Sequence, residues 1–71
     1  MCVGRIIASE RVRAGMTQRQ LASRIGVAQT TVANWEKDRT EPTGKSLKSM
    51  SREFGCSIDY LLGLSDERKA S

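Results

Sequence analysis

Seventy-one residues are enough for one small domain and leave no room for a second. Helix-forming and polar residues dominate, only one Trp, one Tyr and one Phe are present, and strand-like alternation is absent, so the composition favours helices. The net charge is +4 without any histidine: residues 1–52 carry ten cations against four anions, and residues 53–71 carry two against four. This asymmetry is typical of a protein that binds a polyanion through one face, although an ordinary solvated surface gives the same count.

Several classes of protein are disfavoured by what the chain lacks. Cys2 and Cys56 are too few for a disulfide framework or a zinc site, so we expect free thiols in a reducing compartment. The first ten residues lack the apolar core of a signal peptide, and no stretch approaches the roughly 20 apolar residues of a membrane span. Without histidine, a phosphate-cradling glycine loop or a metal-ligand cluster, an enzyme is disfavoured. We expect a soluble cytoplasmic protein with no cofactor, metal, membrane or small-molecule ligand.

Two helices are predicted before the middle of the chain. The first spans residues 3–14, where apolar residues recur with an approximate 3.6-residue period, and it ends at Gly15. Thr17 opens the second helix, because Thr17 and Gln20 fit a capping box in which each side chain satisfies a backbone N–H group. Gly26 interrupts this helix.

Three more helices are predicted in the second half. One begins near Ala28 and reaches Glu36, and a polar loop follows to Pro42. Thr43 caps the next helix, which Gly55 closes. The last runs over residues 58–62. We therefore expect one all-α domain over residues 1–64 and a polar, frayed tail over residues 65–71.

The stretch from Thr17 to Glu36 carries the functional signal. Two short helices meet at a three-residue turn predicted at Ile25-Gly26-Val27, where Gly26 adopts the left-handed region without a Cβ penalty. Ala22 lies one turn earlier, where a small side chain lets two helices approach closely. This pattern predicts a helix-turn-helix, with the helix after the turn projecting from the body.

Residues 7 to 36 read I-x-x-x-R-x-x-x-G-M-T-Q-x-x-L-A-x-x-I-G-V-x-x-x-T-V-x-x-W-E. This run resembles the Cro and phage-repressor helix-turn-helix family, also called the XRE family, and residues 55–63 resemble that family's last helix. The resemblance implies a five-helix, lambda-repressor-like DNA-binding domain with the helix-turn-helix at its second and third helices. It also implies a Cro-like, sequence-specific transcriptional repressor associated with the bacterial nucleoid.

Three residues depart from the family pattern. Glu10 stands where the family usually has an apolar residue, so the first helix is expected to pack less tightly there. Ala28 replaces the usual Ser or Thr cap of the third helix, a loss of about 1 kcal/mol if no other group substitutes. Asp38 replaces the Gly or Asn that often ends that helix.

A helix in the major groove reads bases with side chains in its first turns. The resemblance makes Gln29 the strongest candidate, since its amide can bond adenine N6 and N7 together. Thr30 can place its methyl group against a thymine methyl, and Asn34 can reach a base further along. Ala33 lies on the same surface. The alternative for these four residues is an ordinary solvent-facing helix surface.

A second group of polar residues is expected to contact DNA phosphates. Family members use the residue matching Gln18 to bond the DNA backbone and to brace the third helix, and the start of a helix favours a phosphate. The same role is expected for nearby hydroxyl and cationic side chains, for each of which simple solvation is the alternative; the group comprises Gln18, Arg19, Thr31, Lys37, Arg39 and Lys45. Each such contact would steepen the salt dependence of binding.

Two further roles are structural. The family pairs Arg11 with Glu36, which joins the first helix to the end of the third, and removing one partner strands the other. Trp35, three residues after Val32, is predicted to belong to the core rather than to stack on bases.

The last helix and its neighbours carry more apolar side chains than a short helix on a small core can bury. An exposed apolar patch indicates a partner surface, so we expect a homodimer through this region, with contributions from Tyr60, Leu62 and Leu64. The alternative is that all of them fill the monomer core.

A dimer of this kind would place two third helices in successive major grooves about 34–36 Å apart on a pseudo-palindromic double-stranded DNA operator. A rival interpretation is an antitoxin or other protein-interaction module that uses the same fold and neutralises a partner through its apolar end.

Overall fold

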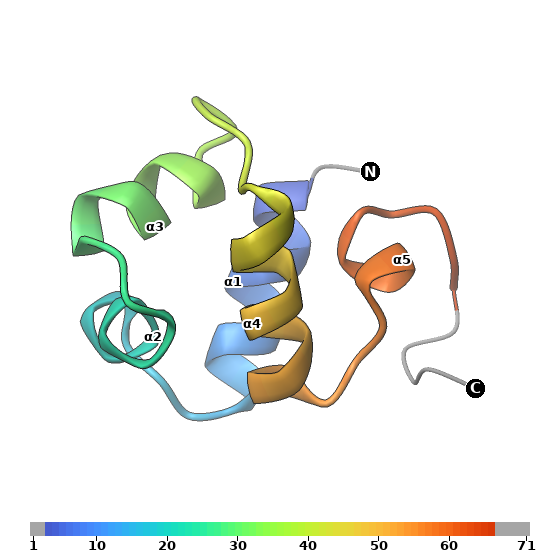
Figure 1. The fold of residues 1–71 in the computed structure, drawn as a ribbon, viewed down its shortest axis with the longest axis horizontal. Helices are drawn as coiled ribbons and strands as arrows, with labels where there is room; N and C mark the ends of the chain where they lie inside the picture. The colour runs from blue at the N-terminus through green and yellow to red at the C-terminus, as the bar shows by residue number, and fades with distance from the viewer. Residues whose placement is uncertain (1–2, 67–71) are drawn as a thin grey trace.

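The structure is a computed structural model, which describes residues 3–66. Within these residues the fold is all-helical, as predicted. Its five helices, labelled in Figure 1, are α1 (Val3–Arg13), α2 (Gln18–Ile25), α3 (Gln29–Glu36), α4 (Gly44–Phe54) and α5 (Ile58–Leu61). The predicted free thiol of Cys2 and most of the predicted tail lie outside the described residues. No helix in the described part is long and apolar enough to cross a bilayer.

The helix boundaries correct the sequence prediction in small ways. α2 retains Ile25, so the turn of the helix-turn-helix is Gly26-Val27-Ala28, one residue later than expected. The reason is that Gly26 reaches the left-handed region with φ 76° while its N–H group still bonds the Ala22 carbonyl. Ala28 is extended and serves as the N-cap of α3. α1 ends at Arg13 rather than at Ala14, and α5 ends at Leu61 rather than at Leu62.

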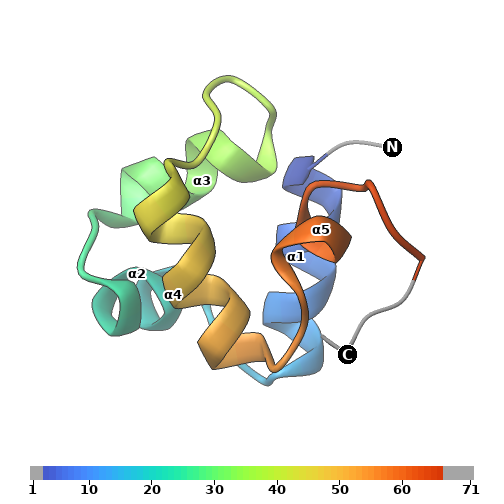
Figure 2. The same cartoon turned by 45° about the vertical axis from the view of Figure 1, so that its right-hand side comes forward.

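Side chains from all five helices meet in one core. The helix-turn-helix pair α2–α3 packs against α1 and α4, and α5 lies beside α1, as the turned view in Figure 2 shows. Trp35 belongs to this core, as predicted, with 4% of its surface exposed. The other buried apolar residues are Ile6, Ile7, Leu21, Ala22, Val32, Leu47, Met50, Phe54, Cys56 and Leu61.

Glu10, which departs from the family pattern, lies on the buried side of α1, and the looser packing expected there stays a prediction. The residue is buried, with 3% of its surface exposed, on the same face of α1 as Ile6 and Ile7. A carboxyl group therefore occupies a place in the core that an apolar side chain fills in the family.

Local capping explains where most of the helices begin. The Thr17 hydroxyl oxygen accepts the Gln20 N–H at 3.1 Å, and the Gln20 side-chain oxygen accepts the Thr17 N–H at 2.9 Å, which confirms the predicted capping box. Thr43 caps α4 and Ser57 caps α5 in the same general way. α3 differs, because Ala28 provides no side-chain cap.

Gly4 is required where α1 crosses the end of α3, a constraint that the sequence pattern does not reveal. A Cβ atom at Gly4 would lie 2.2 Å from the Trp35 carbonyl oxygen and 2.8 Å from that of Glu36. Both are backbone atoms, which cannot rotate out of the way. The first turn of α1 is therefore seated directly on the last turn of α3.

Gly4→Ala is expected to lower the free energy of unfolding by about 3 kcal/mol or more, because the added methyl group forces two backbones apart. Gly44→Ala is the matched control. It lies at the first position of α4 with open space around it, and we expect it to stabilise by about 0.4–1 kcal/mol. Urea unfolding followed by circular dichroism measures both. Similar small changes in the two variants would show that the crossing is not tight.

Candidate nucleic-acid interface

The helix-turn-helix exposes one side of α3 and buries the other. Val32 and Trp35 are fully or almost fully buried, which fixes the inner face of the helix. Gln29 and Thr30, in the first turn, are exposed. The sharp bend at Gly26 thus turns the start of α3 away from the core, and Figure 1 shows this end of α3 at the edge of the molecule.

The four predicted base-reading residues lie along this outer side of α3. Gln29 and Thr30 are exposed at its start, and Ala33 and Asn34 are partly buried one turn later. The side chain of Gln29 is therefore not enclosed in the protein interior. The arrangement suits a short helix that enters a groove by its N-terminal end, where polar side chains and first-turn N–H groups face outward together.

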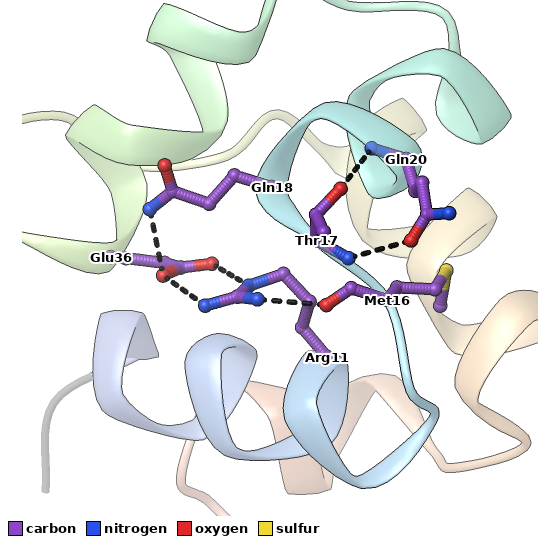
Figure 3. Close-up of polar contacts among 6 residues, drawn as sticks. All are labelled: Arg11, Met16, Thr17, Gln18, Gln20 and Glu36. Carbon is purple, nitrogen blue, oxygen red and sulfur yellow. Dashed lines mark hydrogen bonds and ion pairs between the residues drawn. The ribbon is translucent and has the colours of Figure 1, made fainter.

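A network centred on the Glu36 carboxylate holds the other end of α3 (Figure 3). Arg11 binds both carboxylate oxygens, with Nε 2.7 Å from Oε2 and one terminal nitrogen 3.2 Å from Oε1. The other terminal nitrogen of Arg11 donates to the Met16 carbonyl oxygen at 2.8 Å. Gln18 donates its amide to Glu36 Oε1 at 3.1 Å. The predicted pair of Arg11 and Glu36 is thus present, extended by two further partners.

This network connects three helices. Arg11 comes from α1, Gln18 from the first turn of α2 and Glu36 from the last turn of α3. The paired side chains are mostly buried, with 17% of Arg11 and 9% of Glu36 exposed. In Figure 3 the side-chain amide oxygen of Gln18 points away from Glu36. The bracing role that the resemblance implied for Gln18 therefore has a visible contact, whereas its expected phosphate contact stays a prediction.

The expected phosphate-binding side chains lie on α3 itself and on three segments beside it in the chain, namely α2, the α3–α4 loop and the start of α4. Arg19 is exposed in the first turn of α2, and Lys37 and Arg39 are exposed after the end of α3. Thr31 and Lys45 line one open pocket of about 440 Å³ between the turn, α3 and the start of α4. The fold therefore places Thr31 and Lys45 in the lining of the same pocket, on elements that are separated by the α3–α4 loop.

Asp38 makes a long-range contact in addition to departing from the family pattern at the end of α3. Its carboxylate accepts the Gly4 N–H at 3.1 Å across 34 positions of the chain. No local sequence pattern reveals a contact of this range, so sequence reasoning missed this role.

The predicted dimer residues differ in exposure. Tyr60 and Leu62 are partly buried and pack against the core, whereas Leu64 is 75% exposed. Val12 on α1 is the other large apolar residue exposed in the described part of the chain, at 65%, and its exposure was not predicted. Across residues 3–66, no three potential ligands among His, Cys, Asp and Glu gather where a metal ion would bind.

The geometry is that of a helix-turn-helix domain, and comparison with known proteins agrees. A helix-turn-helix family model matches residues 7–61, and the chain belongs to this family, which is of the XRE type. The predicted family and fold are therefore confirmed.

The curated relatives are transcription regulators. Repressor protein C2 of Salmonella phage P22 is 35% identical over 60 residues, covering 84% of this chain and 28% of the phage protein. The HTH-type transcriptional regulator DicA of Escherichia coli K12 is 35% identical over 97% of this chain and 50% of its own length. ImmR of Bacillus subtilis 168, also an HTH-type transcriptional regulator, is 30% identical over 97% of this chain and 54% of its own length. The chain thus spans between about a quarter and about half of the length of these relatives.

Two solved structures of the P22 repressor have the same fold. The crystal structure of the P22 c2 repressor with a synthetic operator superposes with a TM-score of 0.86 at 32% identity, covering 92% of this chain and 98% of that one. The solution structure of the DNA-binding domain of the P22 c2 repressor superposes with a TM-score of 0.82 at 33% identity, covering 96% of this chain and 92% of that one.

Glu36→Ala is expected to lower the free energy of unfolding by about 3–5 kcal/mol, because it leaves the buried Arg11 charge unpaired. Glu53→Ala removes the partner of Arg24 in a more exposed ion pair, where the Arg24 side chain is 60% exposed. That loss should be about 0–1 kcal/mol. Urea unfolding of the two variants measures the difference. Equal losses would contradict a central role for the Glu36 network.

Proposed function

We propose that this chain is a sequence-specific, DNA-binding transcriptional repressor of the phage or prophage type. The observation that carries the proposal is the presentation of Gln29 and Thr30 on an exposed helix start, with the other end of that helix fixed by the Glu36 network. The net charge of +4 and the likeness to a repressor solved with its operator support it.

In this function α3 lies in the major groove. The Gln29 amide bonds N6 and N7 of one adenine, and the Thr30 methyl group packs against a thymine methyl. Asn34 and Ala33 meet the next base pairs along the groove. Discrimination comes from hydrogen bonds to base edges, because those edges differ in the major groove for each base pair.

Affinity comes mainly from the DNA backbone. The amide of Gln18, the Thr31 hydroxyl and the nearby cations contact phosphates on both sides of the groove; these cations are Arg19, Lys37, Arg39 and Lys45. Each phosphate that is neutralised releases counterions, so binding weakens steeply with salt.

The acting unit is a homodimer that joins through the α5 end of the molecule. Leu64 offers the exposed apolar surface, beside the partly buried Tyr60 and Leu62. Two copies place their α3 helices in successive major grooves of a pseudo-palindromic operator. Repression follows because the bound dimer excludes polymerase from the promoter.

Selection of bound duplexes from a random DNA pool at 0.1 M salt tests this function. The expected product is a motif of two inverted half-sites whose centres lie about 10 base pairs apart, or a multiple of this spacing. A pool that stays random after several rounds would contradict sequence-specific binding.

Gln29→Ala is expected to weaken binding to the selected duplex by about 1–3 kcal/mol and to relax the preference at one base pair of each half-site. Ser23→Ala is the control, since Ser23 is exposed on α2 beside the α1–α2 loop and outside the proposed interface. Titrations against duplexes substituted at each position measure both effects. An unchanged base preference in the Gln29 variant would refute its assignment.

Leu64→Glu is expected to raise the dimer dissociation constant about tenfold or more, because a charge replaces an apolar contact. Val12→Glu places the same charge at the other strongly exposed apolar residue of the described chain and should leave the dimer intact. Sedimentation equilibrium over a range of concentrations measures both. A wild-type protein that remains monomeric throughout would rule out this dimer.

A further inference from the structure

Asp38 has a backbone conformation that its residue type disfavours. Its φ is 58°, and it is the one residue other than glycine with positive φ in the described part of the chain. The Asp38 N–H bonds the Trp35 carbonyl oxygen at 3.0 Å, and the Arg39 N–H bonds that of Asn34 at 2.9 Å. These two bonds form the Schellman motif, whose left-handed position glycine usually fills without strain.

The side chain accounts for an aspartate at this strained position. Its carboxylate accepts the Gly4 N–H in the first turn of α1. That turn contains no acidic residue of its own, so Asp38 supplies the negative charge that a helix N-terminus favours. The same turn packs so closely against the backbone carbonyl groups of Trp35 and Glu36 that a Cβ atom at Gly4 would not fit. The strained backbone and the cap therefore belong to one junction between α1 and α3.

This junction lies inside the proposed phosphate-binding loop. Lys37 and Arg39 flank Asp38 directly, and both are exposed. With the Asp38 carboxylate tied to α1, the loop has a fixed point between its two cations. The two Schellman hydrogen bonds tie the backbone of this loop to α3, and the bond from Gly4 to the Asp38 carboxylate ties it to α1 as well.

We propose that Asp38 is a positioning residue for DNA binding: by capping α1, its carboxylate holds Lys37 and Arg39 where both meet the phosphate backbone. This rests on the proposed DNA-binding function. Asp38 itself contacts no phosphate, since its negative charge would repel one. Its contribution to affinity passes through the two cations beside it.

A matched pair of variants separates the bond from the charge. Asp38→Asn and Asp38→Gly both remove one negative charge and both tolerate the left-handed backbone. Only the asparagine retains an oxygen that accepts the Gly4 N–H. The measurement is the affinity for the selected duplex, and for a scrambled duplex of the same composition, between 0.05 and 0.3 M salt, with folding checked by thermal melting.

The two variants are expected to differ in salt dependence. Asp38→Asn should keep the wild-type slope of log affinity against log salt. Asp38→Gly should have a slope smaller in magnitude by about 1–2, since each phosphate that is no longer neutralised lowers it by about 0.9. At 0.1 M salt, that corresponds to about eightfold weaker binding for each such phosphate. Both duplexes should show the change, because phosphate contacts are independent of sequence.

A double-mutant cycle distinguishes positioning from general stability. In a chain that carries Lys37→Ala and Arg39→Ala together, Asp38→Asn and Asp38→Gly should give the same slope, because the positioned cations are absent. A difference between them that persists in that background would overturn the proposal, as would equal slopes for the two single variants.

Two observations on the wild-type protein complete the test. Hydrogen exchange at the Gly4 amide should be protected, and exchange at the rate of an unstructured peptide would contradict the cap. If the wild-type protein binds neither duplex, the proposed function and this inference both fail. If it binds with a steep salt slope and the Asp38 variants are alike, only the inference fails.

Discussion

The arrangement of the interface depends on one buried carboxylate, that of Glu36. It accepts hydrogen bonds from Arg11 and Gln18, and so ties the end of α3 to α1 and to the start of α2. A carboxylate removed from water is stable only when its oxygens are well bonded. Three donors on two oxygens meet that need, and because they come from two other helices, the orientation of α3 is fixed by the same bonds.

The two ends of α3 have different tasks as a result. Its C-terminal end is held by the Glu36 network, by the seat of Gly4 on the last turn and by the Asp38 carboxylate. Its N-terminal end has no side-chain cap and exposes Gln29 and Thr30. A surface that reads base edges needs both properties, since the helix must be rigidly placed while its polar groups remain free to bond a ligand.

Local signals in the sequence were enough to predict the helices. Gly26 and the Thr17–Gln20 capping box act within one turn of the chain, and the structure has both where they were expected. The turn shifted by one residue because the Gly26 N–H still bonds within α2. The seat of Gly4 and the bond from Asp38 were not predictable in this way. Each joins segments more than thirty positions apart, and only the packed fold brings them together.

The positions at which the chain loses folding free energy through unfavourable local structure also support an interface at α3. Ala28 forgoes a cap that Ser or Thr would provide, at about 1 kcal/mol, and Asp38 adopts a conformation that costs an L-residue about 1–2 kcal/mol. A domain of this size buries too little surface to absorb such losses easily. Both fall at the ends of α3, the helix whose exposed start carries Gln29 and Thr30, whereas the capped starts of α2, α4 and α5 follow the usual rules. Departures of this kind concentrate where a surface serves binding rather than stability.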